Sequence, residues 1–254
     1  MRPAIHTMFA GKVLHHLEKV DSTNAYLHYL IASSPELLPE GLTVVADEQF
    51  AGKGQQGESW EAAAGQNLTA SILLYPKFLL AKQVFHLNKA VALAVRDCLS
   101  TFVEHVKIKW PNDMYVQGNK IAGILMENSL SRNAVQQSII GVGLNVNQTE
   151  FDASIPNPVS LRMLTGKFFE REEILHTLCH EIEKNYLLLR SMQMKKIDDA
   201  YHEHLLGLHE EKQFQRGDEM FTGTIKGVNE NGKLLVETEE NIFEFGVKEV
   251  RIVI

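Results

Sequence analysis

Three spaced glycines after a short β-branched run are the feature that most constrains this chain. Residues 44–60 read VVADEQFAGKGQQGESW, in which Gly52, Gly54 and Gly57 follow the run Thr43–Val45. Strand-like residues followed by spaced glycines predict a loop whose backbone comes close to another group. Exposed N–H groups of such a loop can bind an anion, usually a phosphate. A mobile hairpin loop without a ligand is the alternative interpretation.

The glycine spacing fits neither of the two common nucleotide-binding loops. A dinucleotide fingerprint requires a helix after G-x-G-x-x-G, whereas here the chain continues through Trp60 and Gly65 into a strand-like run. A P-loop requires Lys and then Ser or Thr after its last glycine, but Gly57 is followed by Glu58. Both of these folds are therefore disfavoured.

A second informative segment is Lys109–Asp113, which reads KWPND. Pro111 blocks continued strand pairing, so Asn112 and Asp113 are presented at a turn. Together with Lys120 beyond the next tight turn, the segment offers an amide, a carboxylate and two lysines. An ordinary Pro-Asn-Asp turn between two strands is the alternative.

Two further groups of residues have both a structural and a ligand-binding interpretation. Ser22, Thr23 and Asn24 stand at a predicted helix start, where capping is the favoured role and hydrogen bonding to a polar ligand is the alternative. Gly123 and the segment Gly141–Gly143 interrupt apolar strands. Such glycines indicate close approach of a ligand or another backbone, or else a bulge or a tight helix–sheet contact.

The hydrophobic pattern along the chain predicts two domains. Helices are expected after residue 21, over 81–103 and within 170–206, and strands over 67–75, 106–116, 120–127 and 137–147. Near Gly207 the helical patterns give way to four or five short β-like runs, with Asn231-Gly232 as a hairpin turn. We expect residues 1–206 to form one domain and residues 207–254 a small β-barrel or sandwich.

Charge and composition narrow the class of protein. The 254 residues are 44% apolar with a net charge of −7, which is typical of a soluble globular protein and argues against general nucleic-acid binding. Cys98 and Cys179 lie in helix-like segments, which favours free thiols in a reducing compartment. Without a signal peptide or a membrane span, we expect a cytoplasmic protein.

A possible zinc site is the remaining pattern. His176, Cys179 and His180 share one predicted helix, where a solvated face is favoured over a zinc site.

Four segments occur together in an order and at a spacing typical of one family. They are DSTN at 21–24, EQFAGKGQQGESW at 48–60, KWPNDMYVQGNKIAGILME at 109–127 and GVGLNVN at 141–147. Together they resemble the biotin–protein ligases, also called biotin–[acetyl-CoA-carboxylase] ligases or holocarboxylase synthetases, over nearly the whole chain. The resemblance implies an α+β fold: a class II synthetase-like mixed sheet flanked by helices and related to lipoate ligases, plus a small C-terminal SH3-like β-barrel.

The resemblance also implies a reaction in two steps. Biotin and Mg-ATP first give biotinyl-5′-AMP and pyrophosphate, so ATP and Mg²⁺ are the expected cofactors. A specific lysine of a biotin carboxyl carrier domain then attacks the mixed anhydride and releases AMP. The positive charge of Lys120 is expected to hold the biotin carboxylate and the α-phosphate and to stabilise charge growing on phosphorus.

Site residues carried over from the family fall into three groups. The catalytic group is Lys120, Asp113 and Lys109, and Asp113 either binds Mg²⁺ or orients the incoming lysine. The biotin-binding group is Ser22, Thr23, Asn24, Gln49, Gly52, Lys53, Gly54, Gln55, Lys120 and Gly123. The ATP- or adenylate-binding group is Gln55, Gly57, Trp60, Asn112, Lys120, Gly143 and Asn145. Trp60 is expected to stack on adenine.

The chain departs from the family pattern in two places. The family's glycine loop is typically GRGRxGR, whereas Gln55 and Glu58 stand at two of the basic positions. A neutral glutamine loses a charge-assisted contact, so we expect the intermediate to be held less tightly. The Asp-Ser-Thr motif begins at residue 21, which leaves no room before it for the DNA-binding domain of ligases that also act as repressors. We therefore expect a ligase that does not bind DNA.

Two other functions stay open at this point. A lipoate or octanoate transferase would share the sheet and the lysine, although KWPND and the glycine loop favour biotin. A non-catalytic biotin-binding regulator would keep the pocket, although Lys120, Asn112 and Asp113 argue for an enzyme. Some relatives dimerise edge to edge through the main sheet, so a homodimer is open as well.

Overall fold

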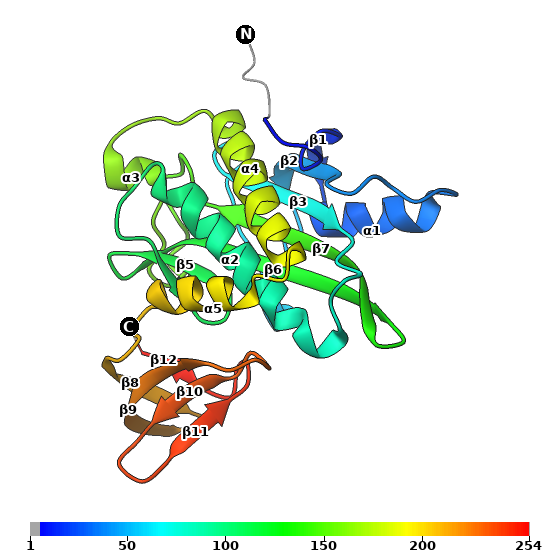
Figure 1. The fold of residues 1–254 in the computed structure, drawn as a ribbon. Helices are drawn as coiled ribbons and strands as arrows, with labels where there is room; N and C mark the ends of the chain where they lie inside the picture. Colours follow the sequence, from blue (N-terminus) through cyan, green and yellow to red (C-terminus); the bar gives the residue numbers. More distant parts are fainter. Residues whose placement is uncertain (1–5, 254) are drawn as a thin grey trace.

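A seven-stranded mixed sheet forms the centre of the larger part of the molecule (Figure 1). The computed structural model describes residues 6–253. The strand order is β1-β2-β3-β7-β6-β5-β4, in which β1 and β2 are parallel and the other neighbours antiparallel. The bounds are β1 Leu14–Val20, β2 Thr43–Gln49, β3 Leu68–Leu74, β4 Lys107–Lys109, β5 Asp113–Val116, β6 Asn119–Ser131 and β7 Ala134–Leu144.

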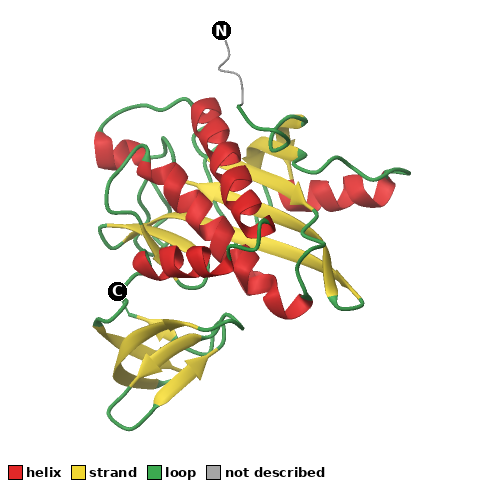
Figure 2. Cartoon of the chain, in the orientation of Figure 1, coloured by secondary structure: helices red, strands yellow, loops and turns green. Residues whose placement is uncertain are grey.

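Helices cover the two faces of this sheet unequally (Figure 2). One face is covered by α2 (Val84–Ser100), α4 (Arg171–Arg190) and α5 (Met194–Glu203). The other face carries α1 (Thr23–Ser33), which packs against β2, β3 and β7. The remaining short elements are η1 (Gln55–Gly57), η2 (Ala81–Gln83) and α3 (Leu161–Thr165). Because α1 is short, it leaves part of its face open.

Apolar residues on both faces of the central strands explain this layering. All seven residues of β3 are buried, and Ile72 packs into the core beneath α2 and α4, whereas its neighbour Leu73 packs with Leu27 of α1. Ile140 and Ile139 of β7 divide between the two cores in the same way. Successive side chains of a strand point to opposite faces, so a continuous apolar run marks a strand that is buried on both sides.

The C-terminal residues form a second sheet, which is antiparallel throughout and has the order β11-β10-β9-β8-β12. Its strands are β8 Glu211–Arg216, β9 Glu219–Val228, β10 Leu234–Glu237, β11 Ile242–Phe245 and β12 Arg251–Ile252. The sequence does not predict β8, because EKQFQR has a single fully buried side chain, that of Phe214. The predicted mixed sheet with helices and the small β part are both present. Closure into a barrel and the division after residue 206 stay predictions.

Other predictions from the sequence have mixed outcomes. The helix expected over 81–103 is shorter, because a 3-10 turn occupies Ala81–Gln83 and α2 ends at Ser100. Cys98 and Cys179 are free and buried as predicted, and burial raises the pKa of the Cys179 thiol to about 12. Within residues 6–253, no helix combines the length and the apolar character needed to cross a membrane.

Candidate active site

A cavity of about 530 Å³ lies on the sheet face that α1 leaves open. Its wall combines the start of α1, the end of β2, the glycine loop, the KWPND segment, strands β6 and β7, and residues 247–252. A volume of this size is typical of a site for a small-molecule ligand. Two segments far apart in sequence, the glycine loop and the C-terminal strand β12, thus border one space.

The structure brings together fourteen of the predicted site residues and leaves three outside. Those lining the cavity are Ser22, Thr23, Asn24, Gln49, Lys53, Gly54, Gln55, Trp60, Lys109, Asn112, Asp113, Lys120, Gly123 and Gly143. Gly52, Gly57 and Asn145 are not part of its lining. Asn145 is 4% exposed, and its Nδ2 donates to the carbonyl of Val159 at 3.1 Å. Its geometry therefore suits a structural role in the loop after β7.

One end of the cavity is built around the start of α1. Ser22 is the N-cap: its Oγ accepts from the backbone N–H of Ala25 at 3.1 Å, so the capping interpretation is confirmed. Oε1 of Gln49 accepts from both the backbone N–H (2.8 Å) and Oγ1 (3.1 Å) of Thr23. This arrangement directs the amide N of Gln49 away from Thr23. The same residues that cap the helix therefore also present polar atoms to the cavity.

Two polar residues that the sequence did not suggest fix the orientation of Asn24. Nδ2 of Asn24 donates to Oε2 of Glu127 at 2.6 Å, so its Oδ1 faces Ser71 and accepts from that hydroxyl at 2.6 Å. Oγ of Ser71 also lies 2.6 Å from Oγ1 of Thr23. Because a carboxylate only accepts, Glu127 sets the donor direction of this whole chain of hydrogen bonds. Ser71 lies outside the four motifs and Glu127 is the last residue of one of them, and both reach Asn24 only through the fold.

Glycines in the sheet make room for side chains of the site. A Cβ added at Gly143 would overlap the indole of Trp60, and one at Gly123 would lie 3.3 Å from the same ring. A Cβ at Gly141 would lie 2.6 Å from Oδ1 of Asn24. Side chains, and not a ligand or another backbone, are therefore what approaches these glycines: Trp60 at Gly123 and Gly143, and Asn24 at Gly141, where the tight helix–sheet contact named as the alternative is found.

The glycine loop folds back on itself. Gly52 accepts from the backbone N–H of Trp60 at 3.0 Å, and Gly54 donates to the carbonyl of Glu58 at 2.6 Å. A side chain at Gly52 would overlap the Trp60 carbonyl. The carboxylate of Glu58 also lies 3.4 Å from Nζ of Lys248, beside the C-terminal sheet. The loop thus places Gln55 at the cavity wall while its two ends are tied together.

The KWPND segment is held tightly against β6. Nδ2 of Asn112 donates to the carbonyl of Ile124 at 2.6 Å, and the backbone N–H of Ile124 donates to the carbonyl of Asn112 at 3.0 Å. Since the amide N of Asn112 is engaged in this way, its Oδ1 is the atom left for a ligand. The Trp110–Pro111 peptide is cis.

An ion pair forms part of the cavity wall. Nζ of Lys120 lies 2.8 Å from Oδ1 of Asp113, and the two side chains are 27% and 19% exposed. Nζ of Lys109 lies 3.5 Å from the Tyr115 hydroxyl and 5.0 Å from the centre of its ring. Burial lowers the pKa of Lys109, and the charge of Lys120 adds to this, although Asp113 opposes it. Burial raises the pKa of Tyr115 to about 12, so it stays a neutral phenol.

The cavity wall includes basic residues from the C-terminal sheet. Lys248 and Arg251 join Lys53, Lys109 and Lys120 around the same space. These five basic residues outnumber the two acidic residues of the lining, Glu58 and Asp113, and such an excess of positive charge attracts anions. Sequence reasoning missed Lys248 and Arg251 because only the docking of the second sheet brings them near residues 22–60.

The acidic residues of the site suit a metal only in combination with a ligand. Within the described residues, no three His, Cys, Asp or Glu side chains gather as a metal site, and this includes the helix that carries His176 and His180. Asp113 and Glu58 are the carboxylates in the cavity lining, and Asp113 lies beside Lys120. Mg²⁺ is commonly held by one or two carboxylates together with substrate phosphates, so the residues present fit Mg²⁺ that arrives with a nucleotide.

Comparisons with known proteins agree with this geometry. Residues 17–145, about half of the chain, match the model of the biotin/lipoate A/B protein ligase family. The chain is 31% identical to the biotin–[acetyl-CoA-carboxylase] ligase of Paracoccus denitrificans over 87% of this chain and 92% of that protein. It is 29% identical to the bifunctional ligase/repressor BirA of Bacillus subtilis over 95% of this chain and 74% of that protein. The structure of biotin protein ligase from Aquifex aeolicus in complex with biotin and ATP is similar with a TM-score of 0.79 and 32% identity, covering 95% and 99% of the two chains.

The chain therefore belongs to the biotin/lipoate A/B protein ligase family. It is a ligase, and the resemblance to biotin–protein ligases inferred from its four motifs is confirmed.

Proposed function

We propose that this ligase joins biotin to a lysine of a biotin carboxyl carrier domain by way of biotinyl-5′-AMP. In the first step, a carboxylate oxygen of biotin attacks the α-phosphorus of ATP and pyrophosphate leaves. In the second step, the ε-amine of the carrier lysine attacks the biotinyl carbonyl, an amide forms, and AMP leaves with loss of one proton from the amine.

The position of Lys120 supports the proposal most strongly. Its ammonium lies 5.9 Å from the centre of the Trp60 ring, in a cavity that the hydrogen-bonding residues at the start of α1 also line. A cation at this junction can contact a carboxylate from one side and an α-phosphate from the other. Such a fixed charge stabilises the negative charge that grows as the two groups react.

Residues at the α1 end suit the ureido ring of biotin. The ring offers two N–H donors and one carbonyl acceptor, and the hydroxyls of Ser22 and Thr23 with the amide of Gln49 can satisfy them. The hydrogen bonds that Thr23 already makes to Gln49 hold these groups in place before the ligand binds. Lys53, Gly54 and Gln55 then border the bound acid from the glycine loop, which can exclude water from the anhydride.

Residues at the other end suit an adenylate. The indole of Trp60 packs against the backbone at Gly143 and borders the cavity, where adenine can stack on it. Oδ1 of Asn112 is available to the edge of the base. Lys109, Lys248 and Arg251 supply positive charge for the phosphates. Mg²⁺ would arrive with the phosphates and neutralise their charge when bound, and Asp113 either contacts it or orients the incoming lysine.

We place the reaction in the cytoplasm, which the two free, buried thiols support. The carrier domain is the proposed protein partner. A homodimer is left open, since no partner chain is needed to complete the cavity described above.

The test is pyrophosphate release from Mg-ATP by the purified chain, with biotin, lipoate or octanoate in turn, followed by addition of a carrier domain. Biotin-dependent release with label transferred to the carrier lysine is the expected result. Release with lipoate or octanoate but not with biotin would assign the chain to the sister activity of its family. Tight biotin binding without pyrophosphate release would make it a non-catalytic binding protein and contradict the proposal.

A further inference from the structure

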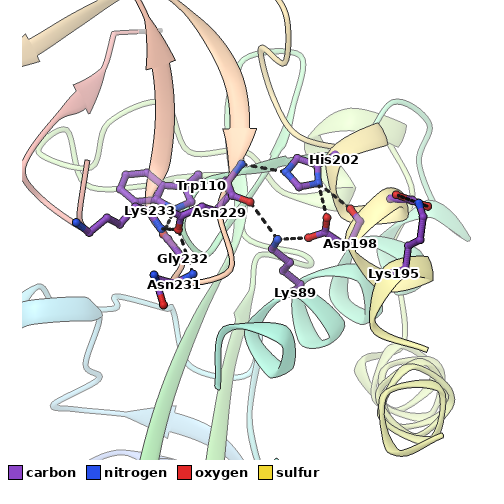
Figure 3. A network of polar contacts seen from close by, with 11 residues as sticks. Lys89, Trp110, Lys195, Asp198, His202, Asn229, Asn231, Gly232 and Lys233 are labelled. Atoms are coloured by element: carbon purple, nitrogen blue, oxygen red, sulfur yellow. Dashed lines mark hydrogen bonds and ion pairs between the residues drawn. The ribbon is translucent and has the colours of Figure 1, made fainter. Parts of the chain in front are cut away.

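The turn between β9 and β10 reaches from the C-terminal sheet to the KWPND segment (Figure 3). The carbonyl of Gly232 in this turn accepts a 2.9 Å hydrogen bond from Nε1 of Trp110. Trp110 is only 5% exposed, so water cannot replace this acceptor freely. Because a buried indole N–H needs a partner, the orientation of Trp110 depends on where the turn lies.

The end of β9 is anchored to the helix layer at both of its backbone polar groups (Figure 3). The N–H of Val228 donates to Nε2 of His202 at 2.9 Å, and the carbonyl of Val228 accepts from Nζ of Lys89 at 3.2 Å. Nδ1 of His202 lies 2.8 Å from the carbonyl of Asp198, so Nδ1 carries the proton and the imidazole is neutral. Lys89 is 1% exposed and pairs with the carboxylate of Asp198. Removing one partner of such a buried pair is costly, which makes the anchor firm.

The tip of the turn is fixed by its shape. Gly232 has a φ of +82°, and a Cβ there would overlap the ring of Phe85 in α2. Oδ1 of Asn229 accepts from the backbone N–H groups of Asn231 and Lys233, both at 3.0 Å. The Asn231-Gly232 hairpin predicted from the sequence is therefore also one of the points of contact with the larger part of the molecule.

The chain continues from Trp110 directly into the active-site residues Asn112 and Asp113. Pro111 separates it from Asn112, which is tied to β6 through Ile124. Asp113 follows and contacts Lys120. The ring of Pro111 leaves few free dihedral angles in this segment, so a rotation of Trp110 is passed on to its neighbours.

We propose that the β9–β10 turn positions Asn112 and Asp113 by way of Trp110. On this view Trp110, Gly232 and His202 are positioning residues for the nucleotide side of the reaction, and the inference rests on the proposed function. The groups proposed for the ureido ring of biotin come from the start of α1 and the end of β2, which lie outside this series of contacts. Disturbing the turn thus changes the rate of adenylation and leaves biotin binding as it is.

The first test compares turnover with biotin affinity in the full chain. Trp110→Phe keeps an aromatic ring and removes the N–H, and we expect kcat for biotin-dependent pyrophosphate release to fall about tenfold to a hundredfold. The Kd for biotin, measured by calorimetry without ATP, is expected to stay the same. His202→Ala has the same expected effect, and His202→Gln restores most of the rate because its side-chain carbonyl can accept from the N–H of Val228. The matched control is Lys226→Ala, on the same strand as Val228. It removes an exposed ion pair with Glu237 of β10, and we expect it to keep the wild-type rate.

A second test does not depend on activity. Exchange of the Trp110 indole N–H with solvent, followed by NMR, is expected to speed up about tenfold in His202→Ala and not in His202→Gln. A wild-type kcat in Trp110→Phe, or unchanged exchange in His202→Ala, would overturn the inference. Equal losses of kcat and biotin affinity would overturn it too, since they indicate general loss of structure. If the wild type releases no pyrophosphate, the proposed function fails, and the exchange measurement still decides whether the turn holds Trp110.

Discussion

Lys120 and Asp113 face each other across neighbouring strands, with Nζ of the lysine 2.8 Å from Oδ1 of the aspartate. Asp113 is paired with Gly123 in the β5–β6 ladder, and the missing side chain at Gly123 leaves room for both charged groups. The pair places one positive and one negative group side by side in the cavity wall, and each can be removed separately.

Removing the lysine is expected to abolish adenylation. In Lys120→Ala, biotin-dependent pyrophosphate release should fall at least about a hundredfold, because the fixed charge at the reacting phosphorus is lost. The free energy of unfolding should fall by no more than about 1 kcal/mol, since a partly exposed ion pair contributes little. Pyrophosphate release and urea unfolding measure the two effects. Lys107→Ala on β4 serves as the control, and near-normal activity in Lys120→Ala would refute the role assigned to Lys120.

Removing the carboxylate is expected to affect the second step more than the first. Asp113→Asn keeps the positive charge of Lys120 but loses a group that can orient the incoming amine of the carrier lysine and accept its proton. We expect biotinyl-AMP to form at a rate within about tenfold of wild type and its transfer to the carrier to slow further. Single-turnover assays of the two half-reactions measure this difference. A larger loss in the first half-reaction would instead favour a role in holding Mg²⁺.

Restoring the basic residue of the glycine loop should tighten retention of the intermediate. Gln55 borders the cavity, and an arginine there would add a charge-assisted hydrogen bond to the adenylate phosphate. Free biotinyl-AMP released without carrier is therefore expected to drop several-fold in Gln55→Arg. Equal release from both proteins would show that other groups, such as Arg251, already supply this contact.

Two glycines of β7 provide a matched pair of variants. Gly143→Ala pushes on the indole of Trp60 and should raise the KM for ATP about tenfold while leaving biotin affinity unchanged. Gly141→Ala pushes on Oδ1 of Asn24 and should weaken biotin binding about tenfold while leaving the KM for ATP unchanged. Steady-state kinetics with each substrate in turn distinguishes the two. If each variant changed the KM for ATP and the affinity for biotin to the same extent, the division of the cavity into two sides would be contradicted.

Stability should fall in acid through the contact between Asp47 and Arg171. Burial acts to raise the pKa of Asp47, but hydrogen bonds from Arg171 and His16 outweigh it, so this pKa lies below its ordinary value of 3.8. A lowered carboxylate pKa stabilises the fold above pH 3.8, and this contribution is lost as the pH falls through the lower value. Arg171→Gln should cost about 1 kcal/mol or less at pH 6, with the difference from wild type shrinking below pH 4. Urea unfolding at several pH values measures this, and a difference that stays constant down to pH 3 would contradict it.

The sequence allows local features of the fold and site to be predicted, because they depend on neighbouring residues. The Asn231-Gly232 turn and the capping residue Ser22 make local hydrogen bonds to residues within four positions, and Gly52 of the glycine loop contacts Trp60 eight positions further on. By contrast, Ser71, Glu127 and Arg251 enter the site only when distant strands meet. Strand β8 escapes prediction for a related reason: most of its side chains face solvent, so its pairing with β9 and β12 carries no hydrophobic signal.

The resemblance to a family adds what spacing alone does not supply. Fourteen of the residues that it implied line one cavity in the structure. It also implied Asn145, which lies outside the lining and whose side-chain amide donates a hydrogen bond to the carbonyl of Val159. Gly52 lies outside the cavity as well, yet it is needed for the backbone of Trp60 to pass close by. A motif can therefore mark residues that shape a site as well as those that contact a ligand.

The cavity takes Ser22 from the first helix and Arg251 from the last strand. A ribosome makes a chain from its N-terminus, so the α1 side of the site emerges early and the strand that completes the opposite wall emerges late. While β12 is still in the exit tunnel, the seven-stranded sheet has already been made and can fold, but the growing chain has only part of its nucleotide wall. Adenylation, and with it the production of a reactive anhydride, would begin only after the second sheet has docked.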